Sequence, residues 1–273
     1  MRRSKVHLIS LIIPAYKQEK TIVRDLLRIK NVMDQLRYSY EIIVVVDGIL
    51  DKTYQKAKKI KSSKIKIIGY KETSGKGHAV KFGMWRANGD IVAFIDAGMD
   101  INPNGISMLL EHLEWYNADI IVGSKLHPVS KVNYPHNRRL LSFGYRLLVK
   151  FLFGLSIRDT QVGIKFFRRK VLEKVLPRLL VKQYAFDIEL LVVARYLGFK
   201  RIYEAPVDLK LKGSSSITSK DILTVILNMF LDTLAVFYRL NIKHYYHTSN
   251  RKHWKFDPNS MLRQYTRNSG RSS

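Results

Sequence analysis

Apolar runs alternate with helix-like patterns along the first half of the chain. Each run is short and rich in β-branched residues, and the segment after it has apolar residues every three or four positions. This alternation predicts strand–helix–strand units, in which a parallel sheet is covered by helices on both faces. The predicted strands lie at 8–13, 41–46, 64–68, 90–95 and 119–122, and the predicted helices at 21–36, 52–61, 77–87 and 104–116. The first half therefore predicts a doubly wound α/β domain of the nucleotide-binding type.

The second half does not keep this alternation. The elements predicted there are an apolar helix at 140–155, a loop at 158–163, a helix at 186–197 and a strand at 201–211. A second long apolar helix follows at 222–240, and the chain then becomes strongly basic. The pattern indicates one α/β domain over residues 1–215 and an appendage over residues 216–273, made of an amphipathic helix and a basic tail.

Both long helices of the second half have a narrow polar stripe on an otherwise apolar surface. The polar positions of the first one recur at spacings of three and four residues; they are Arg139, Ser142, Arg146 and Lys150. A face this broad is expected to bury against protein or to enter a lipid interface. Neither helix reaches about 18 uninterrupted apolar residues, so we expect no membrane-spanning helix. The apolar run that ends at Pro14 is too short for the core of a signal peptide.

The chain is strongly basic. It has 48 Lys and Arg against 22 Asp and Glu, a formal net charge of +26, which favours nucleic acid, anionic lipid or a phosphorylated substrate. The Lys and Arg residues of the tail, with aromatic residues interleaved, follow an amphipathic helix and suit an anionic membrane surface. A nucleic-acid-binding protein is the competing class, but the sequence has no zinc-finger spacing and no aromatic RNP-type strand, so we expect no nucleic-acid partner. Cysteine is absent, which excludes disulfides, a thiolate nucleophile and cysteine metal ligands.

Polar residues follow three of the predicted strands at their carboxyl ends, where parallel sheets bind ligands. These segments are 14–16, 47–48 and 96–100. Asp96 and Asp100 offer the hard oxygen ligands that suit Mg²⁺ or Mn²⁺, and such an ion could bridge to diphosphate oxygens. The same residues are also compatible with a solvated turn that caps the next helix. Gly75-Lys76-Gly77 opens a helix and could present N–H groups and one cation to phosphates, although it lacks the P-loop spacing.

Five short motifs follow one another along the chain: LIIPAY at 11–16, VVDG at 45–48, GKG at 75–77, Asp96-Ala97, and DTQVG at 159–163. In this order they resemble the family 2 glycosyltransferases, over roughly residues 8–215. The segments 159–165 and 184–191 look most like the polyprenyl-phosphate sugar transferases, of the dolichyl-phosphate glucosyltransferase or mannose synthase type. The resemblance implies a GT-A-type doubly wound mixed sheet flanked by helices, with residues 1–215 as the catalytic domain.

The resemblance also implies an activity. A hexose would pass with inversion from a nucleotide-sugar, UDP-glucose or GDP-mannose, to a polyprenyl or dolichyl phosphate. The enzyme would lie peripherally on the cytoplasmic face of a membrane. Whether it associates with a membrane protein partner or forms a homo-oligomer is left open by the sequence. A soluble glycan or polysaccharide precursor is the alternative acceptor. A phosphate monoester, with a second pKa of about 6, is mostly dianionic at neutral pH and needs no strong general base. We therefore expect Asp159 and Asp187 to position reacting groups rather than to remove a proton.

The residue pattern and the resemblance together assign the site. Nucleotide-sugar binding is expected of Pro14, Ala15, Tyr16, Glu19, Asp47, Lys76 and Ala97. Catalytic roles are expected of Asp96, Asp100, Asp159 and Gln161. Acceptor phosphate binding is expected of Lys125, Arg138, Arg139, Ser142 and Lys212. Asp96 and Asp100 are also the expected ligands of Mg²⁺ or Mn²⁺. Gly98 occupies the position of the second aspartate in the family's usual D-x-D pattern, so weaker metal binding or a lower dependence on metal is expected.

Overall fold

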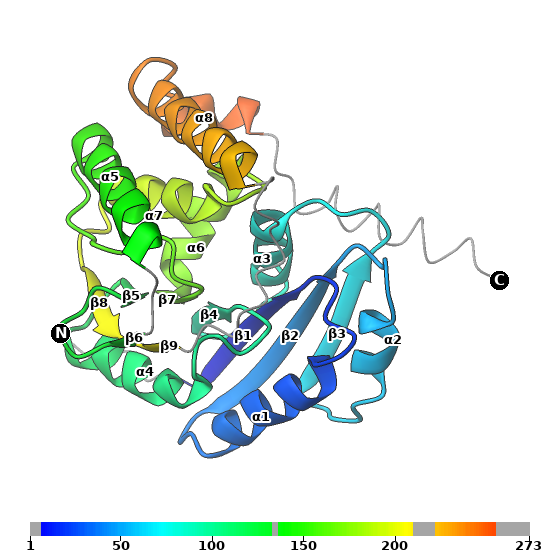
Figure 1. Cartoon of the computed structure of the whole chain (residues 1–273). Coiled ribbons are helices and arrows are strands. Elements are labelled where there is room, and N and C mark those ends of the chain that lie inside the picture. Colours follow the sequence, from blue (N-terminus) through cyan, green and yellow to red (C-terminus); the bar gives the residue numbers. More distant parts are fainter. Residues whose placement is uncertain (1–6, 133–135, 210–221, 255–273) are drawn as a thin grey trace.

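The computed structural model describes residues 7–132, 136–209 and 222–254. Its core is a seven-stranded sheet in the order β3–β2–β1–β4–β7–β5–β8, flanked by helices (Figure 1). The strands are β1 (Leu8–Ala15), β2 (Ser39–Asp47), β3 (Ile65–Tyr70), β4 (Ile91–Ile95), β5 (Ile120–Ser124), β7 (Ile164–Arg168) and β8 (Ile202–Pro206), with β6 (Lys131–Val132) and β9 (Asp208–Leu209) paired separately. The helices are α1 (Ile22–Asp34), α2 (Thr53–Lys58), α3 (Lys76–Met84), α4 (Ile106–Trp115), α5 (His136–Phe153), α6 (Arg169–Val175), α7 (Phe186–Tyr196) and α8 (Ile222–Asn241).

β1 runs through the interior of the sheet because its residues are apolar on both faces. Ile9, Leu11, Ile12 and Ile13 have no exposed surface. The strand pairs in parallel with β2 on one side and with β4 on the other. The chain therefore winds from β1 outward to β3 and then returns across β1 to add β4. At such a switch point the connections diverge, and a crevice opens at the carboxyl ends of the strands.

The sheet is not parallel throughout, because it contains β7, a strand that the hydrophobic pattern does not indicate. β7 lies between β4 and β5 and pairs with both in the antiparallel direction. Phe166 and Phe167 are fully buried there, but Lys165 interrupts the apolar run. A buried lysine is tolerated because its Nζ donates to Asp187 Oδ1 and to the carbonyl oxygen of Val162, both at 2.7 Å. The sheet is mixed, as the family resemblance implies.

The other predicted strands and helices are present, with shifted ends. The predicted strand at 201–211 is divided: β8 pairs with β5, and β9 pairs with β6. The short helix α6 has no counterpart in the prediction. The expected domain boundary between residues 215 and 216 lies outside the described residues and stays a prediction.

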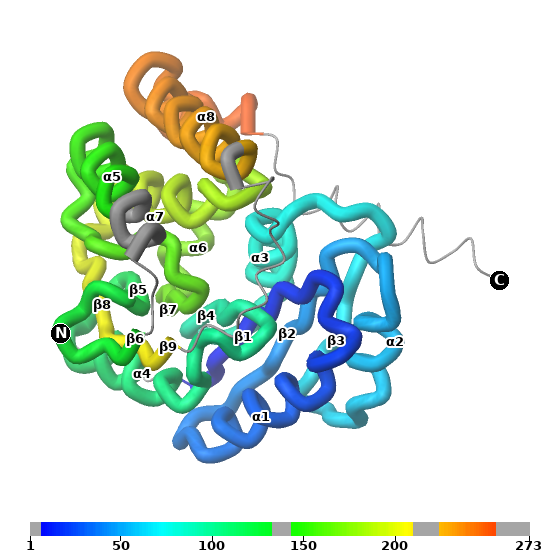
Figure 2. Tube along the Cα trace, viewed as in Figure 1, coloured from blue at the N-terminus to red at the C-terminus, as the bar shows by residue number. Residues whose placement is uncertain are grey.

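α5 and α8 lie side by side at one end of the molecule (Figures 1 and 2). Tyr145 Oη and Thr233 Oγ1 are 2.6 Å apart, and the ring centroids of Phe153 and Phe237 are 6.2 Å apart. α8 also packs against α7, which joins it to the sheet domain. Among the described helices, none combines the length and the hydropathy that a bilayer crossing requires.

Candidate functional site

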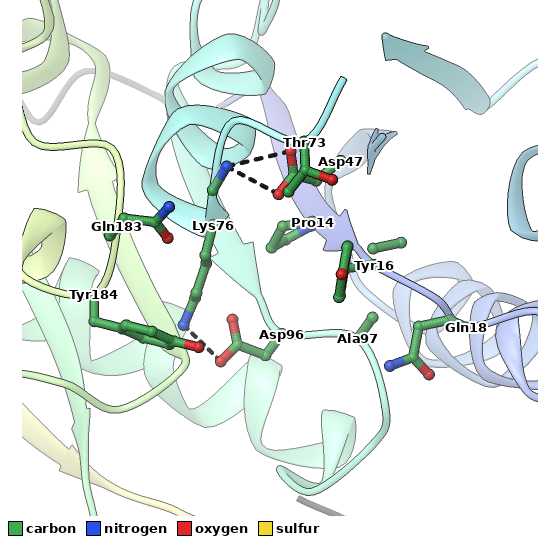
Figure 3. A pocket seen from close by; sticks show the side chains of 12 residues that line it. Pro14, Tyr16, Gln18, Asp47, Thr73, Lys76, Asp96, Ala97, Gln183 and Tyr184 are labelled. Atoms are coloured by element: carbon green, nitrogen blue, oxygen red, sulfur yellow. Dashed lines mark hydrogen bonds and ion pairs between the residues drawn. The ribbon is translucent and has the colours of Figure 1, made fainter. Parts of the chain in front are cut away.

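A cavity of about 390 Å³ lies at the switch point, where β1, β2 and β4 end (Figure 3). The turn before α3 and the loop before α7 complete its walls. The lining residues are Pro14, Ala15, Tyr16, Gln18, Asp47, Thr73, Gly75, Lys76, Asp96, Ala97, Gln183 and Tyr184. The predicted convergence of three strand ends on one crevice is confirmed.

Asp47, at the end of β2, organises the turn that leads into α3. Its Oδ1 accepts the N–H of Ser74 at 2.7 Å, and its Oδ2 accepts the N–H of Gly75 at 3.0 Å. Gly48 follows with φ +79°, and a Cβ there would lie 2.5 Å from Thr73 Oγ1. The carboxylate thus fixes one wall of the cavity, and its remaining lone pairs are what a nucleotide could use.

The GKG segment brings the start of α3 against the loop before α7. Gly75 has φ +99°, and a Cβ on it would lie 2.6 Å from the Lys182 carbonyl oxygen. A Cβ on Gly77 would lie 2.4 Å from Phe186 Cβ. Only glycine permits this approach. The N-terminus of α3, with its partial positive charge, consequently lies at the cavity.

Lys76 and Asp96 meet inside the cavity, beside Tyr184 (Figure 3). Lys76 Nζ donates to Asp96 Oδ2 at 2.7 Å. Burial acts to lower the pKa of Lys76, but the carboxylates of Asp96 and Asp187 outweigh it and raise this pKa above its ordinary value. Lys76 is therefore a permanent cation at the place where a diphosphate would lie.

The other oxygen of Asp96 is the best candidate ligand for a metal ion. Asp96 Oδ1 is buried and has no hydrogen-bond partner among the described residues. A carboxylate oxygen in this state fits Mg²⁺, which proteins often hold through one or two carboxylates together with substrate phosphates, and it fits Mn²⁺ equally. The described part of the chain contains no group of three or more His, Cys, Asp or Glu that could hold an ion. Diphosphate oxygens would have to supply most of the coordination.

The DTQVG segment packs directly on Asp96. The backbone N–H of Asp96 donates to the carbonyl oxygen of Gly163 at 2.9 Å. A Cβ on Gly163 would lie 2.0 Å from Asp96 Oδ2. The position of the Asp96 carboxylate therefore requires glycine at residue 163. Through this contact a motif of the second half packs against the end of β4.

Two residues predicted for the site lie outside the cavity lining. Asp100 is exposed and lies outside the lining, two residues beyond Gly98, and its expected role as a metal ligand with Asp96 stays a prediction. Gly98 has φ +98°, and a Cβ there would lie 3.8 Å from Gln18 Nε2. Glu19 instead accepts the backbone N–H of Lys52 through Oε2 at 3.1 Å. Neither residue belongs to a strand end, since β1 ends at Ala15 and β4 at Ile95.

Asp159, Gln161 and Lys125 also lie outside the lining. Asp159 is buried, and its Oδ2 accepts the backbone N–H of Lys125 at 2.9 Å and lies 3.7 Å from Lys125 Nζ. Gln161 Nε2 lies 2.8 Å from the sulfur of Met229 in α8. These contacts connect the segment after β5 and the loop before β7 to each other and to α8, and the predicted catalytic roles stay predictions.

The other residues expected to bind the acceptor phosphate are not described by the structure at the level of their side chains. Arg138, Arg139 and Ser142 belong to α5, but their side chains lie outside the part of the chain that the structure describes. Lys212 lies outside it altogether. Their expected role in holding the acceptor phosphate stays a prediction.

Four lining residues were not predicted from the sequence. They are Gln18, Thr73, Gln183 and Tyr184, all from loops. Gln18 follows the end of β1 by three residues, and Thr73 and Gly75 flank the turn that Asp47 holds. Gln183 and Tyr184 directly precede α7, so a signal existed in the motif at 184–191. Which loops meet was not evident from spacing, because the contact spans about half of the chain.

Comparison with known proteins agrees with this geometry. The model of the family described as glycosyl transferase family 2 matches residues 10–176. The dolichyl-phosphate beta-glucosyltransferase of Drosophila melanogaster is 34% identical over 205 residues, which cover 69% of this chain and 63% of that protein. Dolichyl-phosphate beta-glucosyltransferase ALG5D of Trichomonas vaginalis is 32% identical over 250 residues, covering 86% and 75%. The chain thus spans slightly less than two thirds of the length of some of these relatives.

Solved structures show the same fold at lower identity. Glucosyl-3-phosphoglycerate synthase from Mycobacterium tuberculosis, in complex with Mn²⁺, UDP and phosphoglyceric acid, superposes with a TM-score of 0.65 at 20% identity, covering 85% of this chain and 78% of that one. A crystal form of the same enzyme with Mg²⁺ and UDP gives a TM-score of 0.63 at 18% identity, covering 84% and 79%. The chain therefore has the GT-A-type fold.

Proposed function

The chain belongs to glycosyl transferase family 2, and from this premise we propose that it transfers a hexose from a nucleotide-sugar to a polyprenyl or dolichyl phosphate. The observation that carries the proposal is the cavity at the switch point. It combines a cationic lysine, a helix N-terminus and a carboxylate oxygen that has no hydrogen-bond partner among the described residues. Between UDP-glucose and GDP-mannose, UDP-glucose is favoured because several relatives are named beta-glucosyltransferases.

The chemistry proposed for the cavity begins with the leaving diphosphate. Lys76 and the N–H groups at the start of α3 would hold its oxygens and stabilise the negative charge that develops as the sugar departs. Asp96 Oδ1 would hold Mg²⁺ or Mn²⁺, and the bound ion would act as a Lewis acid on that diphosphate. Tyr16, 40% exposed at the end of β1, offers a ring to the nucleobase.

The acceptor side of the proposal rests on the second half of the chain. The dianionic acceptor phosphate would attack the anomeric carbon in line, so that the configuration inverts, and Lys125 with Arg138, Arg139, Ser142 and Lys212 would bind it. Asp159, whose carboxylate contacts Lys125 in two ways, would position that lysine rather than remove a proton. Gln161 would have a similar positioning role.

The acceptor also requires a membrane surface, and α5 and α8 support this part of the proposal. Both helices expose large apolar side chains: Phe151 is 88% exposed, Leu231 59% and Leu227 53%. Arg146 and Lys150 accompany them on α5. Exposed apolar residues next to cations suit an anionic lipid surface. We propose a peripheral position on the cytoplasmic face of a membrane.

The direct test of the reaction is release of nucleotide from UDP-glucose and from GDP-mannose, each with and without polyprenyl phosphate and Mn²⁺. Release that requires the lipid and occurs with one donor is expected, with Asp96→Ala as the inactive control. Release that does not depend on the lipid would indicate a soluble glycan acceptor instead. No release with either donor would exclude both hexosyl transfers.

The membrane surface is tested separately by co-sedimentation with vesicles. Phosphatidylglycerol vesicles are expected to bind the chain more tightly than phosphatidylcholine vesicles. Phe151→Ser should weaken this binding about tenfold, because roughly 1.5 kcal/mol of apolar transfer is lost. Trp115→Ser is the matched control, since Trp115 is 80% exposed but lies on α4. Equal effects of the two substitutions would contradict the assigned surface.

A further inference from the structure

The loop at 179–185 supplies one wall of the cavity through Gln183 and Tyr184. On its cavity side this loop rests on the start of α3, where the N–H of His78 donates to the Lys182 carbonyl oxygen at 3.0 Å. The loop has no strand or helix of its own before α7 begins. Its shape therefore depends on what holds its first residues.

A single buried carboxylate holds them. Glu189, in the first turn of α7, has no exposed surface, and its Oε2 accepts the backbone N–H groups of Leu180 and Val181, both at 2.8 Å. Lys81 Nζ donates to the carbonyl oxygen of Leu179 at 2.9 Å, from the other side. Two consecutive peptide groups, 179–180 and 180–181, are thus fixed by charged side chains away from solvent, where such hydrogen bonds are strong.

The second oxygen of Glu189 is occupied by the C-terminal part of the chain. Its Oε1 accepts the hydroxyl of Tyr246 at 2.8 Å and lies 3.4 Å from a guanidinium nitrogen of Arg239, in the last turn of α8. Tyr246 is itself fully buried. Arg178, just before the loop, donates through Nε to the Tyr246 carbonyl oxygen at 2.9 Å, and it lies over the ring of Trp254.

We propose that Glu189 is a positioning residue. It couples the position of α8 and Tyr246 to the position of the loop that carries Gln183 and Tyr184 into the cavity wall. One oxygen of the carboxylate serves the loop and the other serves the C-terminal segment. Neither set of donors can move without leaving part of a buried charge unpaired. The same α8 exposes Leu227 and Leu231 at the surface assigned above to lipid. A change at that surface consequently reaches the nucleotide cavity through Glu189. This inference deepens the proposed function and rests on it for the identity of the nucleotide.

The test removes one hydroxyl from the C-terminal side of the network. Tyr246→Phe keeps the ring but deletes its hydrogen bond to Glu189. Tyr245→Phe is the matched control, because it removes a neighbouring hydroxyl that donates to the His253 carbonyl oxygen at 3.3 Å. Binding of UDP and of GDP is measured by titration calorimetry, and KM and kcat are measured for the preferred donor.

Tyr246→Phe is expected to weaken nucleotide binding and to raise the donor KM, each about fivefold, which corresponds to one lost hydrogen bond. The kcat and the KM for lipid should change little. Glu189→Gln should have a larger effect in the same direction.

The outcomes separate this proposal from the proposed function. Unchanged nucleotide binding in Tyr246→Phe, or the same loss in Tyr245→Phe, would overturn the coupling even if thermal stability fell. If no donor supports turnover but UDP or GDP binding still weakens in Tyr246→Phe alone, the coupling holds and the proposed reaction fails. If neither nucleotide binds the unmodified chain, both are overturned.

Discussion

Lys76 with Asp96 and Lys165 with Asp187 form two ion pairs with the same nitrogen–oxygen distance, 2.7 Å. The first pair, called the cavity pair here, has side chains that are 27% and 38% exposed. The second, called the buried pair, has side chains that are 0% and 6% exposed. An ion pair open to solvent can exchange partners when an anionic ligand arrives, whereas a desolvated pair cannot lose a partner without leaving an isolated charge. The same chemistry therefore serves ligand binding in one place and architecture in the other.

The two halves of the molecule differ in the same way. In the half built from β1 to β4, Asp47 and Asp96 stand at strand ends and face the cavity. In the second half, Asp159 and Glu189 are buried, and their oxygens accept hydrogen bonds from loop backbone. The Lys76–Asp96 pair of the first half is therefore available to a ligand, whereas Asp159 and Glu189 of the second half hold loop backbone in place.

The largest expected effect is on stability, from breaking the buried pair. Asp187→Asn leaves the Lys165 ammonium without its counter-charge inside the sheet. Removal of one partner of a buried pair typically lowers the free energy of unfolding by about 3–5 kcal/mol. Urea denaturation would measure this loss. The double variant Lys165→Met with Asp187→Leu should recover most of the lost free energy of unfolding. If Asp187→Asn alone were as stable as the parent, the contrast between the two pairs would be contradicted.

The equivalent change in the cavity pair should leave stability almost unaltered and reduce turnover. Asp96→Asn is expected to change the free energy of unfolding by less than about 1 kcal/mol, since the pair is partly exposed. Turnover should fall about a hundredfold, because charge stabilisation of the leaving diphosphate is lost. Steady-state kinetics and urea denaturation on the same samples give both values. A large loss of stability would mean that the cavity pair is structural after all.

His78 sharpens the comparison, because it is a largely buried group in the ligand-binding half. Its ring packs against those of Tyr70 and Phe82, which also contact each other. Burial, with help from Lys81 and Lys182, lowers the pKa of His78 to about 4 from an ordinary value of 6.5. The unfolded chain therefore binds more protons than the folded chain between pH 4 and pH 6.5, so stability rises with pH across this window and is lost as pH falls.

The expected contribution of His78 is a loss of about 1–2 kcal/mol in the free energy of unfolding between pH 7 and pH 5. His78→Phe keeps an aromatic ring in the same place and should remove this part of the pH dependence. The measurement is urea denaturation of both proteins at the two pH values. Parallel pH profiles would show that folding does not lower the pKa of His78.

The smallest expected effect concerns the metal. Gly98→Asp would add a second carboxylate near Asp96. There is room for a side chain, since a Cβ at residue 98 would lie no closer than 3.8 Å to Gln18 Nε2, although the φ of +98° strains any residue other than glycine. Binding of Mn²⁺ in the presence of UDP, followed by electron paramagnetic resonance, should tighten about tenfold, as expected for an additional hard ligand. Asp100→Asn is the control and should leave Mn²⁺ binding unchanged. A strong loss in that control would restore Asp100 as a metal ligand.

The sequence by itself determined most of the ligand-binding half. The strands that end at Ala15, Asp47 and Ile95 could be predicted because continuous β-branched runs have few alternatives, and parallel strands place their carboxyl ends at one edge of a sheet. The GKG segment and Asp96 could be assigned to that edge from their position after predicted strands. Short motifs in a fixed order were sufficient to indicate the family.

Only the tertiary structure decided the rest. β7 was hidden because Lys165 breaks its apolar pattern, and its counter-charge, Asp187, lies 22 residues away. Asp100 and Glu19 were expected at the site but lie outside the lining of the cavity, and which loop residues line it depends on turn geometry that spacing does not encode. The role of Glu189 depends on donors at residues 180, 181, 239 and 246. Such long-range pairings are selected by packing and by the need to satisfy buried charges, and neither condition can be evaluated before the chain is folded.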